Sequence, residues 1–400
     1  MQIGARHRYA IPKALHRHQI LTRFLTDFVI SEQALAYVDR WLPRGVRKRL
    51  RSRAIPADLA RLTETSMHIL WQGRNQSAQK LGRESWDQTM VRESIRACPA
   101  DTTIMVGLYL EAIAAFEEMK SRGIQTVMEV YIAPHSALIV RDENKKYPQI
   151  ASRRYDAMCE TADQTWGRAI AATDHYIAPS QFVVEGLNYF GVDTSCVRVV
   201  PYGVPDEFFC VENKPIPKRV LFVGTADIRK GIHYFAEASS RLHHAGYEFH
   251  VVGGACDRVQ KLLRENHVVY HGRIPRHQTL AEYEKADLFV LPSLAEGSAT
   301  VAYESMAAGV PVITTPNAGS VITNEIDGII VPVCDANELT KQIDRIASNR
   351  NLRDELAGEA RTTAARYRLD AYGDRFVEAL LELTGSGVPK NQHPEGNTAP

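Results

Sequence analysis

The segment LPSLAEGSATVAYESMAAGVPVITT, residues 291–315, carries the pattern that decides the fold. It begins as the end of an apolar strand, passes through a loop of small residues and enters a helix near Ala299. Gly309 and Pro311 then end that helix, because glycine is favoured just past a helix and proline cannot continue one. The segment therefore predicts a strand, a loop and a helix of a parallel α/β sheet.

The sequence around this segment shows the same alternation of strand and helix patterns. From residue 219 onward, short β-branched runs alternate with helical stretches, which is typical of parallel strands joined by crossover helices. We expect strands at 220–223, 248–252, 268–270, 288–291, 310–314 and 328–331, with helices near 231–245, 280–286 and 301–308. Six such strands predict a doubly wound, Rossmann-like domain.

The N-terminal half repeats the alternation less cleanly, and a second α/β domain is the simplest interpretation. Its candidate strands are 25–30, 103–107, 126–131, 175–178 and 197–200. Four prolines in 201–217 break regular structure and suit an interdomain connection. We therefore predict one domain over 1–204 and a second over 205–365, followed by an amphipathic helix at about 366–384 and a disordered tail at 385–400.

Composition indicates an ordinary globular protein. The chain has 400 residues, 44% of them apolar and 24% charged, which is enough for two cores. Its six cysteines are scattered without a Cys-x-x-Cys pair, which argues against a disulfide framework or zinc ligation and favours a reducing compartment. Neither a secretory signal nor an apolar run of about 18 residues is present, so we expect a cytoplasmic protein.

Charge is distributed unevenly between the two ends of the chain. Residues 1–56 hold twelve Arg or Lys and three acids, a local charge of +9 in a chain whose formal sum is +1. Such an asymmetry predicts that one face of the N-terminal half meets an anionic surface, such as phospholipid, a polyprenyl phosphate or a charged glycan.

The loop and helix of segment 291–315 suit an anionic ligand. In an open parallel sheet, ligands bind beyond the carboxyl ends of the strands, where a helix N-terminus offers unpaired backbone N–H groups. We expect main-chain groups there to hold a diphosphate. The candidates are Ser298, Ala299, Thr300 and Val301.

Two carboxylates bracket this helix start. Glu296 precedes the helix and Glu304 lies about one turn inside it, so each can accept hydrogen bonds from a different pair of sugar hydroxyls. A purely structural alternative exists for each, because the helix dipole alone favours acids in a first turn. Similarly, Arg229 and Lys230 before Gly231 can form a simple solvated turn.

Taken together, these residues resemble the signature of glycosyltransferase family 4, retaining enzymes of the GT-B fold, in which two glutamates are separated by seven residues. The resemblance extends to VLFVGTADIRKG at 220–231, to HGRIPRHQTLAEYEKADLFVLPS at 271–293 and to VRVVPYGVPDEFF at 197–209. It implies two Rossmann-like domains facing a cleft, with the C-terminal helix crossing back to the N-terminal domain.

The resemblance also implies roles for individual residues. Glu296 contacts the transferred sugar and Glu304 the ribose, while Lys230 with Arg229 neutralises the diphosphate leaving group. A preorganised cation stabilises that charge as the glycosyl bond breaks. Because the helix terminus and Lys230 supply positive charge, and because no Asp-x-Asp motif is present, no metal or other cofactor is expected.

Gly224 and Arg273 fall in matching segments and are expected at the donor. Two departures from the pattern stand out. Thr225 follows Gly224 where many members carry arginine, so charge neutralisation rests on the Arg-Lys turn. Ser298 and Ala299 replace the usual aromatic residue and glycine, which alters the sugar pocket.

The N-terminal half offers weaker candidates. Gly4, followed by Ala5, corresponds to the family's donor-covering glycine loop, although one glycine near a terminus also suits a simple turn. The family places a residue, often histidine, near the anomeric carbon. His135 after TVMEVYIAP is the local candidate and Glu129 its rival, while a loop histidine is also commonly just surface.

The sequence thus predicts a retaining hexosyltransferase that moves a sugar from a nucleoside diphosphate sugar to a glycan or lipid-linked hydroxyl, for surface polysaccharide or glycoconjugate synthesis. The alternatives are a nucleotide-sugar epimerase, a glycosyl phosphorylase or a non-catalytic sugar-binding protein on the same fold. The donor base, sugar and acceptor depend on loops that the pattern does not place.

The segment WLPRGVRKRLRSRAIP, 41–56, mixes apolar and cationic side chains. We expect it to contact an anionic membrane surface at the inner face of the membrane. An exposed basic helix without a partner is the alternative, and nucleic acid is disfavoured because no recognition motif accompanies the segment.

Overall fold

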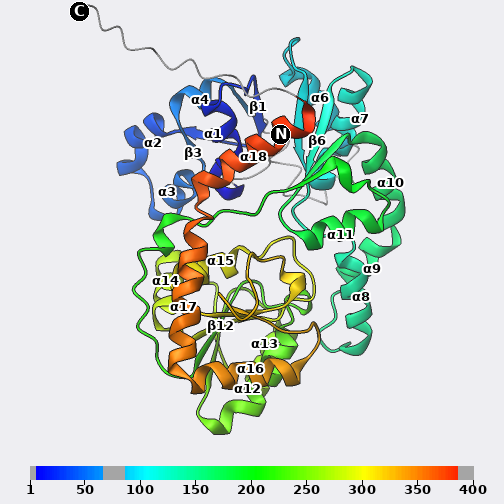
Figure 1. Cartoon of the computed structure of the whole chain (residues 1–400). Helices are drawn as coiled ribbons and strands as arrows, with labels where there is room; N and C mark the ends of the chain where they lie inside the picture. The colour runs from blue at the N-terminus through cyan, green and yellow to red at the C-terminus, as the bar shows by residue number, and fades with distance from the viewer. Residues whose placement is uncertain (1–5, 66–85, 386–400) are drawn as a thin grey trace, which may run out of the picture.

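The computed structural model describes residues 6–65 and 86–385. Two α/β halves lie one above the other, the N-terminal half at the top of Figure 1 and the C-terminal half below it. The expected GT-B architecture of two Rossmann-like domains is confirmed by the sheets of the two halves.

The C-terminal half is built on a six-stranded parallel sheet. The strands lie in the order β11-β10-β9-β12-β13-β14. Successive strands are added on one side of β9 and then on its other side, as in a doubly wound fold. The strands are β9 Arg219–Val223, β10 Glu248–Val252, β11 Val268–Gly272, β12 Leu288–Leu291, β13 Val312–Thr314 and β14 Ile329–Ile330. They match the six strands expected from the β-branched runs, and the runs of β9, β12 and β13 are buried on both faces of the sheet.

Helices cover both faces of this sheet. They are α12 Ile232–Leu242, α13 Asp257–Glu265, α14 Arg276–Lys285, α15 Thr300–Ala307, α16 Ala336–Ser348 and α17 Arg350–Ala365. In α16 the side chain of Asp335 caps the helix by accepting from the N–H of Glu338 at 2.9 Å. Leu339, Ile343 and Ile346 then recur at helical spacing and are buried against the core.

The N-terminal half holds a smaller parallel sheet in the order β5-β6-β7-β8. Its strands are β5 Ile104–Leu108, β6 Gln125–Glu129, β7 His175–Ala178 and β8 Val197–Val199. The helices beside it are α6 Trp86–Ala97, α7 Ile113–Ser121, α8 Ser136–Lys146, α9 Arg153–Glu160, α10 Ala162–Ala172 and α11 Gln181–Tyr189.

The described part of the first 65 residues forms a layer of short elements. They are α1 Ala10–Arg17, β1 Phe24–Thr26, β2 Ile30–Ser31, α2 Glu32–Val38, α3 Arg44–Arg51, β3 Ala54–Ile55, α4 Ala57–Arg61 and β4 Thr63–Thr65. The single strand expected at 25–30 is wrong. Asp27 is buried in an ion pair with Arg53, and the chain turns there, so β1 pairs with β4 and β2 pairs with β3.

Short 3-10 helices occupy several connections. They are η1 Arg6–Tyr9, η2 Asp39–Trp41, η4 Tyr109–Ala112, η5 Thr194–Cys196, η6 Asp206–Phe208, η7 Ile228–Lys230, η8 His243–Ala245 and η9 Pro316–Ala318. Two of them, η7 and η9, flank the loop after β12 and help to position it.

The last helix, α18 Leu369–Thr384, returns to the N-terminal half, as expected (Figure 1). Its buried stripe of Tyr372, Phe376 and Leu380 packs with Ala14 and Leu15 of α1. The chain crosses between the halves twice, near Val204 and near Tyr367. The two crossings lie side by side, since the N–H of Val204 donates to the carbonyl of Tyr367 at 2.8 Å. The tail expected to be disordered begins at Gly385, and its remainder lies outside the described residues.

Buried hydrogen bonds to one carboxylate join the two halves at a distance from this crossing. The Nε2 of His233 on α12 lies 3.1 Å from Oε1 of Glu143 on α8, and the hydroxyl of Tyr234 donates to the same oxygen. Burial raises the pKa of Glu143, but hydrogen bonds from His233, Tyr234 and Lys146 outweigh it and lower the pKa to about 2. The carboxylate is therefore charged at neutral pH.

Among the helices in the described ranges, none combines the length and apolar character needed to cross a bilayer.

Candidate functional site

The loop after β12 leads from the sheet into α15. Strand β12 ends at Leu291, and α15 begins at Thr300, so residues 292–299 lie beyond the carboxyl end of the sheet, as expected. Glu296 is in this loop, and Glu304 is inside α15. The turn with Arg229 and Lys230, in η7, follows β9, the strand next to β12.

The structure brings Glu296, Arg229 and Lys230 together. Oε2 of Glu296 lies 2.6 Å from a guanidinium nitrogen of Arg229, and Oε1 forms an ion pair with Nζ of Lys230. The three side chains keep 11–15% of their surface exposed. We call these three residues the charge cluster. Asp227 lies beside it and interacts electrostatically with both cations, so the two cations face two carboxylates.

Backbone contacts fix the geometry of the charge cluster. The carbonyl of Arg229 accepts from the N–H of Leu294 at 2.8 Å, and the Arg229 guanidinium donates to the carbonyl of Ala295 at 2.8 Å. The N–H of Glu296 donates to the carbonyl of Asn317 at 3.0 Å. The turn after β9 and the loop after β12 are thus held to one another before any ligand arrives.

Gly231 makes this close approach feasible. Its φ of 67° lies in the left-handed region, and a Cβ there would collide with the carbonyl oxygen of Pro292. Glycine at this turn therefore lets Lys230 sit against the loop that carries Glu296.

The electrostatics of the charge cluster keep Glu296 ionised. Burial raises the pKa of Glu296, but the positive charges of Lys230 and Arg229 outweigh burial and leave the pKa below its ordinary value. Asp227 caps η7 by accepting from the N–H of Lys230 at 3.1 Å, and burial raises its pKa.

Glu304 contacts a different set of side chains. The hydroxyl of Tyr283 donates to it at 3.3 Å, and a guanidinium nitrogen of Arg276 lies 4.0 Å away. Burial raises the pKa of Glu304 to about 7, although Arg276 and Tyr283 act in the opposite direction. Arg276 also pairs with Glu207, which in turn pairs with Arg8 at 2.7 Å. The N-terminal segment thus reaches the surroundings of Glu304.

The expected main-chain donors at the start of α15 need one correction. The N–H of Ala299 already donates to the carbonyl of Ala318 at 2.9 Å, so it is not available to a diphosphate. The hydroxyl of Ser298 is engaged with the carbonyl of Gly319 and with Tyr303. Thr300 and Val301 occupy the first turn of α15, where the helix itself supplies no acceptor for their N–H groups.

Gly224 and Arg273 lie at the same edge of the sheet. Gly224 follows β9 with a φ of 138°, and a Cβ there would lie 3.2 Å from Cε of Lys230. The exposed Arg273 follows β11, and its guanidinium lies over Gly254, which follows β10. Both expected residues are therefore at the carboxyl ends of strands of this sheet, β9 and β11, with β10 between them.

The N-terminal half contacts the loop that carries Glu296. The N–H of Ala133 donates to the carbonyl of Glu296 at 3.3 Å, and the hydroxyl of Ser180 donates to the carbonyl of Gly297 at 2.5 Å. A Cβ on Gly297 would collide with the carbonyl of Tyr131. The site therefore includes residues from both halves.

His135 lies near this closure, but its ring points elsewhere. The ring packs on Phe182 and Tyr189, and a Cβ on Gly186 of α11 would strike its Nδ1. Burial lowers the pKa of His135. None of the ring contacts found in the described part of the chain joins His135 to the charge cluster.

Glu129, the rival of His135, is buried at the end of β6 and accepts from the hydroxyl of Tyr372 at 3.2 Å. It lines a cavity of about 410 Å³ between β5 and the helices α1 and α18. Gly4 lies outside the described residues.

Sequence reasoning missed several residues of the site. Tyr283, Arg276 and Glu207 surround Glu304, and Asn317 and Asp227 position the charge cluster. Tyr283 and Arg276 lie in the segment 271–293 that resembles the family, and this was the signal that could have found them. Glu207 is brought in only by the tertiary fold.

Comparison with known proteins agrees with this geometry. Residues 206–363 match the family model described as Glycosyl transferases group 1. The chain is 28% identical to the putative teichuronic acid biosynthesis glycosyltransferase TuaC of Bacillus subtilis, over 60% of this chain and 61% of that protein. It is also 28% identical to the N,N'-diacetylbacillosaminyl-diphospho-undecaprenol alpha-1,3-N-acetylgalactosaminyltransferase of Campylobacter jejuni, over 42% and 45%.

Each of these relatives is therefore matched over less than two thirds of its length. Among solved structures, HepE of Anabaena in complex with UDP aligns with a TM-score of 0.61 at 13% identity, covering 96% of this chain and all of that one. This likeness shows the GT-B fold. The C-terminal domain is thus similar, over residues 206–363, to the group 1 glycosyl transferases.

Proposed function

We propose that the chain, with this domain as its donor-binding half, is a retaining glycosyltransferase of family 4. It would move a sugar from a nucleoside diphosphate sugar to a hydroxyl of a glycan or lipid-linked acceptor. The observation that carries the proposal is the charge cluster, in which Glu296 meets Arg229 and Lys230 beyond the carboxyl ends of β9 and β12. Two cations beside a helix start suit a diphosphate.

Donor binding would rearrange the charge cluster. In the absence of donor, Lys230 and Arg229 are neutralised in part by Glu296. A diphosphate would take over these cations, together with the N–H groups of Thr300 and Val301, and would leave the carboxylate of Glu296 to accept hydrogen bonds from sugar hydroxyls.

Glu304 suits the opposite end of the donor. It lies eight residues after Glu296, inside α15, and the hydroxyl of Tyr283 donates to it beside Arg276. A ribose can donate two hydroxyls to one carboxylate, and this would favour the ionised form of Glu304.

The proposed chemistry balances without an added base. The bond between the anomeric carbon and the diphosphate oxygen breaks, and the acceptor oxygen forms its bond on the same face. The leaving phosphate oxygen takes the proton of the acceptor hydroxyl. Lys230 and Arg229 stabilise the negative charge that develops on the diphosphate, a contribution of about 3–4 kcal/mol for one well-placed donor in comparable sites. No metal is required by this scheme.

The acceptor would enter from the N-terminal half. The loop after β6 and Ser180 border the loop with Glu296, so groups of that half face the sugar. The names of the two relatives refer to teichuronic acid biosynthesis and to a diphospho-undecaprenol sugar. These names support a glycan or lipid-linked acceptor in polysaccharide or glycoconjugate synthesis.

The experiment is a transfer assay with a panel of nucleoside diphosphate sugars and simple glycan or lipid-linked acceptors. We expect acceptor-dependent release of nucleoside diphosphate, and a product whose anomeric configuration by NMR equals that of the donor. Inversion would contradict the retaining assignment. Release that requires inorganic phosphate would indicate a phosphorylase, epimerisation without acceptor would indicate an epimerase, and donor binding without turnover would indicate a sugar-binding protein.

A further inference from the structure

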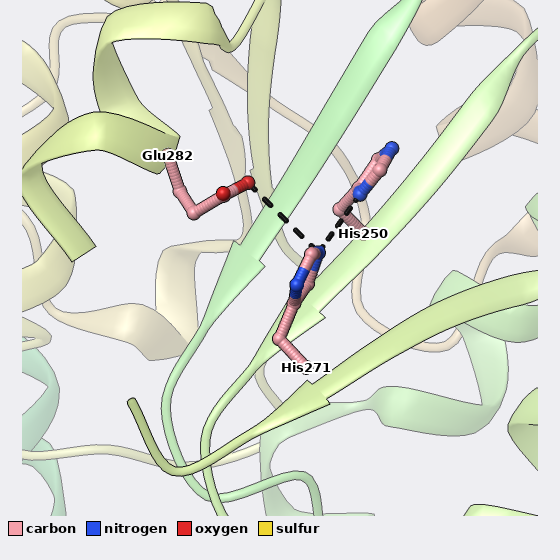
Figure 2. Close-up of side chains that lie close together, drawn as sticks. All are labelled: His250, His271 and Glu282. Carbon is pink, nitrogen blue, oxygen red and sulfur yellow. Dashed lines mark hydrogen bonds and ion pairs between the residues drawn. The ribbon is translucent and has the colours of Figure 1, made fainter. Parts of the chain in front are cut away.

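Two imidazoles and one carboxylate converge on one side of the C-terminal sheet (Figure 2). His250 is on β10, His271 on the neighbouring edge strand β11, and Glu282 on α14. Nδ1 of His250 lies 3.0 Å from Nε2 of His271, and that Nε2 lies 3.9 Å from Oε2 of Glu282. One ligand atom from each residue lies within 4.8 Å of the other two.

These separations are close to those of a metal site. Zinc bound tetrahedrally at about 2.0–2.1 Å from its ligands holds them roughly 3.3 Å apart. The two nitrogens are already near that separation, and the carboxylate oxygen must approach the nitrogen of His271 by about 0.6 Å. No two of the three ligand atoms need to approach each other by more than about 1.5 Å. The two rings face each other across a single hydrogen bond.

The surroundings favour histidines that act as ligands. Oε2 of Glu248 lies 3.5 Å from Nε2 of His250, the ring nitrogen that points away from His271. A carboxylate in this position orients a metal-binding imidazole by accepting the proton of its outer nitrogen, so that Nδ1 presents a lone pair. Two carboxylates, Glu248 and Glu282, therefore flank the two imidazoles.

Arg219 is the one cation recorded at this cluster within the described ranges. It donates to Oε2 of Glu282 at 2.5 Å, which orients that carboxylate and opposes a bound cation by its charge. Glu248 and Glu282 together offset Arg219 and part of the charge of a divalent ion. The side chain of His271 is 26% exposed, which leaves room for entry of the ion and for a water ligand.

We propose that His250, His271 and Glu282 bind one divalent transition-metal ion, with zinc preferred and water completing the coordination. The site shares no residue with the charge cluster, so its role is structural. The ion would tie the edge strand β11 to β10 and α14, immediately before Gly272 and the donor-side Arg273. This inference does not depend on the proposed transferase activity.

The test is a titration of the full chain, freed of metal by chelator dialysis, with Zn²⁺ and with Co²⁺. We expect one equivalent of Zn²⁺ to bind, the midpoint of thermal unfolding to rise, and Co²⁺ to give the intense visible absorption of a four-coordinate site. His271→Gln should weaken Zn²⁺ binding at least 100-fold. The matched control is His267→Gln, which alters an exposed histidine stacked on His243 with ring centroids 3.9 Å apart.

A second variant, Glu282→Gln, removes a charge while keeping the side-chain shape, and it should weaken binding at least tenfold. Circular dichroism of the metal-free variants checks that each is folded. Absence of stoichiometric binding to the wild type would overturn the proposal. Equal affinity in the wild type and His271→Gln, or loss of binding in His267→Gln alone, would also overturn it, because the ion would then sit on surface histidines.

Discussion

The backbone N–H of Ala133, just after β6, donates to the carbonyl oxygen of Glu296 across 3.3 Å. This bond joins the N-terminal half to the loop with the first signature glutamate. Ser180 makes a second such bond to Gly297, so the two halves meet at the residues that would grip the donor sugar. We therefore expect closure of the halves and binding of the donor to be coupled.

Gly297→Ala tests this closure. The new Cβ would collide with the carbonyl of Tyr131, so we expect the halves to separate and the free energy of unfolding to fall by about 1–3 kcal/mol. The control is Gly358→Ala in α17, where a Cβ meets nothing within 4 Å and helix propensity should improve. Equal stability of the two variants in thermal unfolding would show that the contact is absent in solution.

Lys230→Ala tests the leaving-group role. We expect kcat to fall by about 10²- to 10³-fold, because one preorganised donor to a developing charge is lost. Lys341→Ala, which alters an exposed lysine 3.1 Å from Glu338 on α16, should leave the rate unchanged. A decrease of less than threefold in Lys230→Ala would mean that the cation does not act on the diphosphate.

Glu304 predicts a pH dependence of donor binding. Burial raises the pKa of Glu304 from 4.5 to about 7. Between pH 4.5 and pH 7 the folded chain therefore binds a proton that the unfolded chain has lost. As a result, the free energy of unfolding falls as the pH rises through this range. A ribose needs the ionised carboxylate, so the affinity for a nucleoside diphosphate should rise with pH up to about 7 and then level off.

The matched control for this pH dependence is Glu304→Gln. Titration of the phosphate is common to both proteins, so the ratio of wild-type to variant affinity isolates the carboxylate. We expect that ratio to rise between pH 5.5 and 7.5, about tenfold per unit at its steepest. A ratio that does not change with pH would place the ribose away from Glu304.

The basic segment 41–56 predicts peripheral membrane contact. Trp41, just before α3, is 76% exposed. Arg47 and Arg51 pair with Asp39, so the fold neutralises part of the positive charge that the sequence predicted for this segment. Trp41→Ala should weaken binding to anionic vesicles several-fold. Tyr189→Ala, at an exposed aromatic residue on α11, should not. Equal sedimentation of both variants with vesicles would argue against this contact.

The sequence predicted the C-terminal sheet and the charge cluster because their signals are local. Buried parallel strands appear as β-branched runs, and Arg229, Lys230 and Glu296 each follow such a run. The small strands β1 to β4 were not predicted, because their pairing depends on Asp27 meeting Arg53 across the fold. The hydrogen bond from the N–H of Ala299 to the carbonyl of Ala318 was likewise not predicted, because no pattern in the sequence indicates a partner 19 residues away.

The most direct test of the account is a calorimetric titration of the full chain with uridine, adenosine and guanosine diphosphates, beside the same titration of Lys230→Ala. The account predicts that at least one of these nucleotides binds with one-to-one stoichiometry, and that Lys230→Ala weakens this binding at least tenfold. Failure of all three to bind the wild type, or equal binding to the wild type and Lys230→Ala, would contradict a diphosphate site at the charge cluster.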